Sequence, residues 1–290
     1  MAINKATFRK RSLTAILFVV IMLAGILWNV WSFFILFTII HMGCWIEWKQ
    51  LVGRIDKHYQ RITSVHQVAI MLSGWVLMIL FVTKVMSSGS VWRQYCAIVL
   101  ALLFLLAIVA DVWKSVFTWK NLGYSIAGLG YISLSWALII DLRVKGILGL
   151  GDRQWDLGWI LPMVLIASIW INDTMAYIVG SLIGKTPLSS ISPNKTWEGT
   201  IGGALLAITV VTAVWYFFVI EVSWKQIAGI AAIAAVVGTI GDLFESKLKR
   251  LANVKDSGHI MPGHGGFLDR FDSLLLATPA VWLFLYFVDR

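Results

Sequence analysis

The sequence predicts an all-α, polytopic integral membrane protein with about nine transmembrane helices. Two observations of composition support this class: 59% of the 290 residues are hydrophobic, and only 13% are charged. The third observation is that apolar runs long enough to cross about 30 Å of hydrocarbon recur from one end of the chain to the other. Because these runs and their short connections use nearly the whole chain, we expect no sizeable soluble domain.

The apolar runs define the expected spans in order along the chain. They cover residues 13–27, 30–46, 67–83, 92–113, 122–140, 157–182, 200–220, 226–244 and 273–288. The first run follows basic residues, as in a secretory signal, but no small-residue cleavage site follows and a second run begins almost at once. We therefore expect an uncleaved first span. Many of the 16 tryptophans stand near span ends, where they anchor helices at the membrane surface.

The basic residues predict the orientation of these spans. If the chain crosses the membrane nine times, 17 of the 24 Lys and Arg residues fall on the side of the N-terminus. Basic residues are retained on the cytoplasmic side, so the N-terminus is expected inside and the C-terminus outside. The loops that follow the second, fourth, sixth and eighth spans then face the cytoplasm, where soluble nucleotides and metal ions are found.

Two GxxxG pairs allow helix backbones to approach closely: Gly180 with Gly184, and Gly199 with Gly203. We expect a packing role for them, and they also permit a homodimer. The two cysteines lie inside apolar runs, too far apart for a disulfide framework or a thiolate metal site, so both are expected to be packing residues.

The first of three polar clusters interrupts the sixth span at Asn172 and Asp173. A carboxylate at that depth is costly unless it meets a partner, a cavity or an ion. Tyr177 is one helical turn beyond Asp173 and shares its helical face. We expect Asp173 to face a binding site, the alternative being a structural pair satisfied inside the protein.

The second cluster is the loop of residues 184–203, between the sixth and seventh spans. It offers two cations, Lys185 and Lys195, together with glycines that leave backbone amides open. Its hydroxyl side chains are Thr186, Ser189, Ser190, Ser192 and Thr196. Point charges, many donors and close backbone approach are what a phosphate group needs, although no Walker motif is present. An ordinary solvated loop would explain the polarity but not the density of donors.

The third cluster extends from the end of the eighth span to the start of the ninth. Asp242 and Ser246 are four residues apart and share a helical face, and Asp269 and Asp272 open the last helix on a common face. Several carboxylates converging from two helix ends suit Mg²⁺, which binds through one or two carboxylates and substrate phosphates. Cations for the remaining phosphate charge are Lys249, Arg250, Lys255 and Arg270. The residues thus predict a site for a polyphosphate and a divalent metal at the membrane surface.

The run from Ser246 to Asp272 resembles the signature of the phosphatidate cytidylyltransferases, or CDP-diacylglycerol synthases. The matching residues are Ser246, Lys249, Arg250, Lys255, Asp256, Gly258, Pro262, His264, Gly265, Gly266, Asp269, Arg270 and Asp272. Two upstream segments, residues 172–177 and 191–199, also resemble motifs of that family. The likeness covers about residues 170–273, and Met261, where the family more often has Leu, Ile or Phe, is a mild departure.

The resemblance implies a reaction: phosphatidate and CTP give CDP-diacylglycerol and pyrophosphate with Mg²⁺, and a second cation is compatible with it. Such a transfer belongs to phospholipid biosynthesis. The expected partners are CTP, phosphatidate and the lipid bilayer, and not nucleic acid. The expected location is the bacterial inner (cytoplasmic) membrane, with the active site on the cytoplasmic side. About five spans in residues 1–150 then form an N-terminal part, and residues 151–290 form the catalytic transmembrane region with its cytoplasmic loops.

The resemblance also implies roles for individual residues. The expected metal ligands are Asp242, Asp269 and Asp272. The expected catalytic residues are Asp242, Lys249, Arg250, Lys255, Asp256, Asp269, Arg270 and Asp272. The expected substrate-binding residues are Asp173, Ser192, Lys195, Thr196, Ser246 and His264. For His264, metal ligation and a purely conformational role in the turn stay open.

Two other functions fit parts of the pattern. A CTP-dependent lipid kinase would use a similar metal and phosphate site, but it would attack with a neutral hydroxyl, which ought to need a base. Its product would separate it from the synthase, because the kinase releases CDP and the synthase pyrophosphate. A transporter would also have an intramembrane Asp173, but it gives no reason for the long loop of acidic and basic residues.

Overall fold

The computed structural model describes residues 5–85, 89–148, 156–218, 222–258 and 265–288. In residues 5–13, 89–90, 147–148 and 218 it describes the backbone only. Within these ranges helices are the only regular elements, apart from an isolated bridge between Pro187 and Thr196. The predicted all-α class is therefore confirmed.

Ten α-helices occupy the described ranges: α1 (Lys5–Leu27), α2 (Val30–Ile55), α3 (Ser64–Val82), α4 (Gly89–Trp113), α5 (Trp119–Gly128), α6 (Leu134–Leu148), α7 (Ile160–Ile183), α8 (Trp197–Phe218), α9 (Trp224–Leu251) and α10 (Leu268–Val288). The short segments η1 (Tyr59–Arg61) and η2 (Thr83–Val85) are 3₁₀ helices. The π-helix η3 (Leu129–Ser133) joins α5 to α6, so that Trp119–Gly146 is one span.

In the part of the chain that the structure describes, eight helical spans are long and apolar enough to cross a membrane. Thr14–Leu27, within α1, is a shorter apolar stretch. These nine segments coincide with the nine predicted spans. The prediction of a polytopic membrane protein is therefore confirmed.

Several helices extend beyond the apolar runs that predicted them, α2, α9 and α10 among them. Helix α2 continues from the expected end at 46 to Ile55, α9 continues from 244 to Leu251, and α10 begins at Leu268 instead of 273. Hydropathy marks only the apolar part of a helix, whereas backbone hydrogen bonding continues into the polar residues that follow. The extensions place several charged residues on helices, among them Glu47 at the polar end of α2.

The chain divides into two compact units. The first unit comprises residues 1–159 and 251–270, and the second comprises residues 160–250 and 271–290. The loop that carries most of the signature residues thus belongs to the first unit, although it is distant in sequence from the other residues of that unit.

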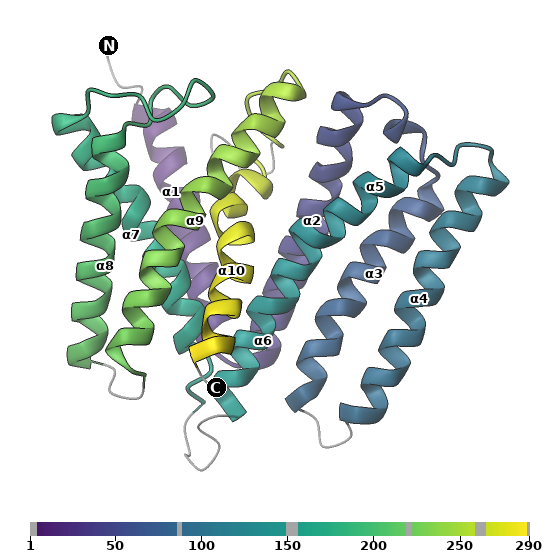
Figure 1. The fold of residues 1–290 in the computed structure, drawn as a ribbon, viewed down its shortest axis with the longest axis horizontal. Helices are drawn as coiled ribbons and strands as arrows, with labels where there is room; N and C mark the ends of the chain where they lie inside the picture. Colours follow the sequence, from purple (N-terminus) through teal and green to yellow (C-terminus); the bar gives the residue numbers. More distant parts are fainter. Residues whose placement is uncertain (1–4, 86–88, 149–155, 219–221, 259–264, 289–290) are drawn as a thin grey trace. The chain divides into compact units, whose positions relative to one another are not determined.

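In the first unit, α2 contacts α3, α5 and α6, and α3 also packs against α4 (Figure 1). Its core contains large buried side chains from these helices: Phe33, Phe37, Ile70, Met78, Trp136 and Ile139. The π-helix is tied to α2 because Ser133 Oγ lies 3.0 Å from His41 Nε2 and 2.9 Å from Trp45 Nε1.

In the second unit, α7 lies along α8 at close approach (Figure 1). A Cβ atom on Gly199 would stand 2.7 Å from the Ala176 carbonyl oxygen, and one on Gly203 would stand 2.7 Å from the Ala176 Cβ. Helices α9 and α10 also meet closely, since a Cβ on Gly241 would stand 2.6 Å from the Asp272 carbonyl oxygen. The glycines of the GxxxG pairs therefore pack α7 against α8 within one chain.

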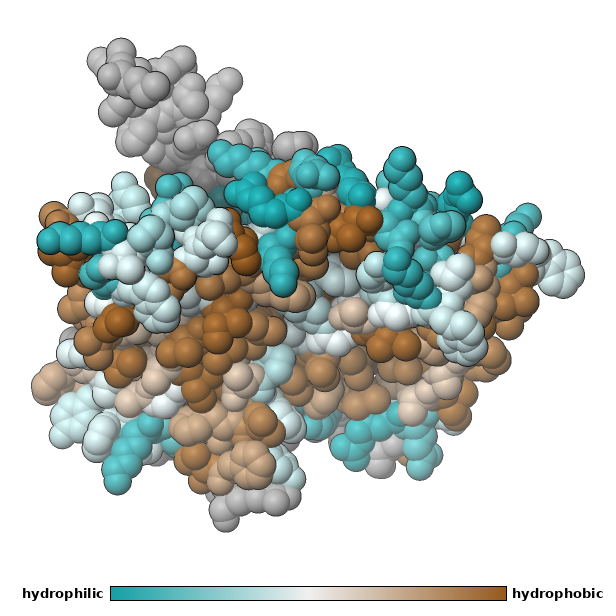
Figure 2. Space-filling view, turned by 45° about the horizontal axis from the view of Figure 1, so that its top comes forward, coloured by the Kyte–Doolittle hydropathy of each residue, from teal (hydrophilic) through white to brown (hydrophobic). Residues whose placement is uncertain are grey.

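The distribution of side chains on the surface matches a membrane protein. Figure 2 shows hydrophobic side chains across the middle of the view and hydrophilic side chains above and below them. On α4 the exposed side chains include Ile98, Leu102, Leu105 and Val109. Exposed apolar side chains along a helix are expected where lipid surrounds it.

Candidate active site

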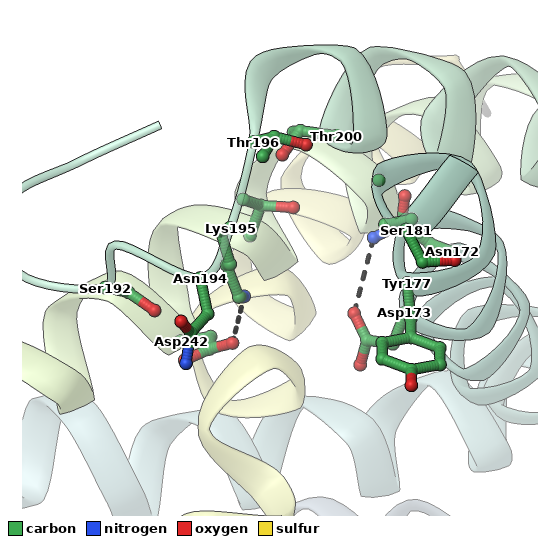
Figure 3. Close-up of a pocket in the computed structure, with 13 residues that line it drawn as sticks. Asn172, Asp173, Tyr177, Ser181, Ser192, Asn194, Lys195, Thr196, Thr200 and Asp242 are labelled. Atoms are coloured by element: carbon green, nitrogen blue, oxygen red, sulfur yellow. Dashed lines mark hydrogen bonds and ion pairs between the residues drawn. The ribbon is translucent and has the colours of Figure 1, made fainter. Parts of the chain in front are cut away.

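A cavity of about 470 Å³ lies within the second unit, between α7, α9, the start of α8 and the loop that joins α7 to α8. Most of the residues that line it have polar side chains: Asn172, Asp173, Ala176, Tyr177, Gly180, Ser181, Ser192, Asn194, Lys195, Thr196, Thr200, Thr239 and Asp242. Figure 3 shows the side chains of α7 on one side of the hollow and those of the loop and α9 on the other. Five of the expected site residues, Asp173, Ser192, Lys195, Thr196 and Asp242, thus line one cavity.

The α7 wall of the cavity carries Asp173. Its carboxylate points into the hollow, and Asn172 Nδ2 donates to Asp173 Oδ1 at 3.4 Å (Figure 3). Tyr177 lines the same wall one turn further along the helix, as its spacing predicts. The structure therefore supplies the cavity that a carboxylate within a span requires.

The opposite wall carries an ion pair between Lys195 and Asp242 (Figure 3). Ser246 Oγ donates to Asp242 Oδ1 at 3.3 Å, so the predicted common face of Asp242 and Ser246 is present. The pair connects the loop after α7 with α9. A cation and a carboxylate therefore face the cavity together, and both are charged groups that a phosphate or a metal ion can engage.

The loop before α8 is stabilised by hydrogen bonds that no sequence motif indicates. Glu198, in the first turn of α8, accepts hydrogen bonds from Thr186 Oγ1 at 2.8 Å and from Lys185 N at 3.1 Å. Leu188 N donates to Lys195 O at 2.7 Å, and Thr196 Oγ1 accepts from Gly199 N at 3.1 Å. These bonds fix the backbone on both sides of Lys195 and thereby position its ammonium group.

A third carboxylate of the second unit, Asp272 near the start of α10, interacts electrostatically with Asp242 and with Asp173. Lys249 also interacts with Asp272, while its ammonium group pairs with the buried Glu245 one turn earlier on α9. The signature cation Lys249 is therefore oriented by a carboxylate that the sequence analysis did not single out.

The three expected metal ligands do not form one cluster in the part of the chain that the structure describes. Among the described residues, no three Asp, Glu, His or Cys side chains form a group that could hold a metal ion. Asp242 and Asp272 belong to the second unit and Asp269 to the first. The carboxylate, hydroxyl and amide oxygens that line the cavity are nevertheless of the hard type that Mg²⁺ prefers.

In the first unit, Asp269 organises the signature loop. Its Oδ2 accepts hydrogen bonds from Ser257 N at 2.8 Å, Ser257 Oγ at 3.0 Å and Gly266 N at 2.8 Å. Gly265 has a φ of +82°, and a Cβ there would stand 3.0 Å from the Asp269 Cγ. Glycine is therefore required beside this carboxylate for two reasons, backbone conformation and space.

Lys255 and Asp256 line a second, smaller cavity of about 280 Å³ in the first unit. Helix α2 contributes Gln50 and Arg54 to its lining. Arg250 and Arg270 are exposed, and His264 lies outside the described residues.

The first unit also contains an Asp-His-Ser arrangement that the sequence did not reveal. His66 Nδ1 lies 2.8 Å from Asp111 Oδ2, and His66 Nε2 lies 2.8 Å from Ser125 Oγ. All three side chains are at most 1% exposed. Since a substrate cannot reach a side chain so deeply buried, the arrangement serves to join α3, α4 and α5.

These observations define the class as a polytopic α-helical membrane protein with a charged cavity among its helices. The sequence model of the cytidylyltransferase family matches residues 9–288 of this chain. The chain therefore belongs to the cytidylyltransferase family.

Curated relatives carry the name phosphatidate cytidylyltransferase. The one from Staphylococcus aureus (strain COL) is 35% identical over 187 residues, which cover 64% of this chain and 67% of that protein. The one from Bacillus subtilis (strain 168) is 38% identical over 189 residues, or 65% of each chain. The one from Staphylococcus haemolyticus (strain JCSC1435) is 34% identical over 187 residues, or 64% of this chain and 67% of that protein.

Proposed function

We propose that this protein transfers a cytidylyl group from CTP to phosphatidate, releasing pyrophosphate and forming CDP-diacylglycerol. The observation that carries the proposal is the cavity of about 470 Å³ that combines Asp173, Lys195 and Asp242 within membrane-spanning helices. Membership of the cytidylyltransferase family and the names of the relatives support the same reaction.

The chemistry suits the residues. A phosphate oxygen of phosphatidate attacks the α-phosphorus of CTP, the bond between the α-phosphorus and the bridging oxygen breaks, and pyrophosphate leaves. A phosphate monoester has a second pKa near 6, so it is largely ionised at neutral pH and needs no general base. The protein has to bring two polyanions together and neutralise the charge of an in-line transfer. Lysines, arginines and carboxylates that hold a cation are sufficient for that task.

Roles follow for the residues of the two units. We assign Lys249, Arg250, Lys255 and Arg270 to phosphate groups. Asp173, Ser192, Lys195, Thr196, Ser246 and His264 are assigned to contacts with the nucleotide or the lipid phosphate. Asp256 is assigned to the catalytic loop with them.

Mg²⁺ is part of the proposal. Asp242, Asp269 and Asp272 would hold it, because hard oxygen donors at helix ends suit this ion. The bound ion would neutralise phosphate charge during the transfer. A second cation is compatible with the number of carboxylates in the second unit. Asp242 also forms an ion pair with Lys195.

We further propose that the protein lies in a bacterial inner membrane with the cavity on the cytoplasmic side. The bias of 17 among 24 Lys and Arg residues supports this orientation. Residues 1–150 would then form an N-terminal set of spans, and residues 151–290 the catalytic region. A homodimer is also proposed. The GxxxG glycines do not support it, because they pack α7 against α8 within one chain.

The test is transfer of label from α-labelled CTP to phosphatidate by the purified full-length chain in detergent with Mg²⁺. We expect labelled lipid and an equal amount of pyrophosphate, with ATP, GTP and UTP as controls. A lipid kinase would release CDP instead, and a transporter would give no turnover without a sealed compartment. Absence of labelled lipid with folded protein would contradict the proposed function.

A further inference from the structure

The polar end of α2 carries a buried carboxylate, Glu47, that bonds to the signature loop. Its side chain is 2% exposed. Glu47 Oε1 accepts a hydrogen bond from Phe267 N at 2.8 Å. Glu47 Oε2 accepts from Leu268 N at 2.9 Å and from Ser257 Oγ at 2.7 Å. One side chain from the N-terminal spans therefore contacts both ends of the segment 257–268.

The Ser257 hydroxyl joins Glu47 to Asp269. Ser257 Oγ lies 2.7 Å from Glu47 Oε2 and 3.0 Å from Asp269 Oδ2. A hydroxyl has one proton to donate, and the shorter distance favours Glu47 as its acceptor. The Ser257 backbone N–H donates to Asp269 instead, at 2.8 Å. Two carboxylates thus fix Ser257 from two sides, and the position of Asp269 depends on the bonds that Glu47 makes.

The glycines on both sides of this contact leave room for the Glu47 carboxylate. A Cβ atom on either Gly258 or Gly266 would overlap that carboxylate. The ring of Phe267 lies over Gly43, one turn before Glu47 on α2, where a Cβ would overlap the ring. The loop backbone is therefore packed directly on one face of α2, and two glycines of the signature are explained by the contact with Glu47.

The same face of α2 continues to the smaller cavity. Gln50 and Arg54 follow Glu47 at helical spacing and line that cavity with the segment from Val254 to Gly258. Lys255 and Asp256 come directly before Ser257 in this segment. A shift of Ser257 would therefore also move the two signature residues that face the cavity.

We propose that Glu47 is a positioning residue of the cytidylyl transfer, which fixes residues 257–258 and 265–268 and through them Lys255, Asp256 and Asp269. The expected effect of Glu47 on the rate of transfer rests on the proposed function. The structural part of the inference, that Glu47 protects the ends of the loop, does not depend on the reaction. The resemblance to the family motifs covers about residues 170–273, so it assigns no role to α2.

The test is Glu47→Gln in the full-length chain. Both carboxylate oxygens accept hydrogen bonds, so an amide would turn an N–H group toward at least one of the present donors. The matched control is Asp111→Asn, the same chemical change at a buried carboxylate of the same unit that bonds to Thr63 and His66. Three quantities are measured for each variant: thermal stability in detergent, kcat and KM for CTP, and hydrogen exchange of the peptides that cover residues 257–268.

We expect Glu47→Gln to speed exchange in this segment about tenfold or more and to lower kcat about a hundredfold through misplaced phosphate contacts. Asp111→Asn is expected to lower thermal stability, with exchange in the segment and kcat of the folded protein unchanged. If Glu47→Gln does not fold, Ser257→Ala replaces it, with a smaller change in the same direction. The inference is overturned if exchange and kcat stay at the wild-type level, or if both variants lose activity only in proportion to stability. Failure of the proposed function would appear differently, as absence of transfer by the wild type.

Discussion

At the scale of single residues, the charges of the cavity explain one another. Asp173 would be costly within a span, but it opens on a cavity whose other wall holds the ion pair of Lys195 and Asp242. Lys195 is the cation of this cavity lining, and hydrogen bonds on both sides fix its backbone. The arrangement keeps positive and negative charge in one place, which suits a site where phosphates replace one of the partners.

The first residue-scale prediction concerns Asp173→Asn. The amide keeps the size of the side chain and removes its charge, so transfer should fall about 10- to 100-fold, the value of one hydrogen bond to a charged group. The yield of folded protein should stay normal, because the side chain faces the cavity and not a packed core. Initial rates and extraction yield check this, and wild-type activity in the variant would assign Asp173 a purely structural role.

The second residue-scale prediction concerns the expected metal ligands. Asp269→Asn and Asp272→Asn should each lower the rate by about a thousandfold and raise the Mg²⁺ concentration needed for half-maximal activity. The bonds given to Asp269 go to Oδ2, where an asparagine can present its carbonyl oxygen, so the change tests mainly the charge. The control is Asp56→Asn, which removes a carboxylate that pairs with Lys120 and lines neither of the two cavities. Near-normal rates with unchanged Mg²⁺ dependence in both variants would falsify the metal assignment.

At the scale of elements, the packing of α7 on α8 sets the geometry of the cavity. Asp173 stands on α7, and the loop with Lys195 enters α8 immediately before the closely packed Gly199. If the two helices separate, the walls of the cavity separate with them. Small residues at this contact therefore serve the site as well as the fold.

The element-scale prediction compares two glycine substitutions. Gly199→Ala places a Cβ 2.7 Å from the Ala176 carbonyl oxygen and should destabilise the protein by about 1–3 kcal/mol, with lower activity in the folded fraction. Gly123→Ala, on α5, meets nothing within 4 Å and should be neutral or stabilising by up to about 1 kcal/mol. Thermal unfolding in detergent measures both, and equal behaviour of the two variants would contradict the packing argument.

At the scale of the whole molecule, the charge distribution predicts which loops share a side of the membrane. Lys57 follows α2, Ser190 lies between α7 and α8, and Lys247 lies near the end of α9, and all three are exposed. By the count of basic residues these positions are expected to face the cytoplasm. Lys225, at the start of α9, is expected on the external side.

Cysteines introduced singly at these four positions test the topology. With a reagent that cannot cross the membrane, Lys57→Cys, Ser190→Cys and Lys247→Cys should react only after the cells are opened. Lys225→Cys should react in intact cells. The native Cys44 and Cys96 are buried and give the background. Reaction of any of the first three in intact cells would show that the nine-span orientation is wrong.

The sequence by itself determined the class of protein, the number of spans and the family. Hydropathy and the positions of basic residues are sums over many residues, so they tolerate local error. The signature residues can also be identified from sequence, because a signature depends only on residue types and their spacing along the chain. The sequence also predicted that Asp173 and Tyr177 share a face, because residues four positions apart in a helix are separated by about one turn.

Only the tertiary structure decided which distant residues meet. Glu47 lies just past the apolar run of residues 30–46 and belongs to none of the three polar clusters, yet it accepts hydrogen bonds from Ser257 and from Leu268, more than 200 residues later. Glu198 at Thr186 and Glu245 at Lys249 are further partners that no motif marks. Spacing along one helix is regular and can be read from sequence, whereas a hydrogen bond between two elements depends on how the whole chain packs. The carboxylates that organise the loops therefore became visible only once their helices were placed.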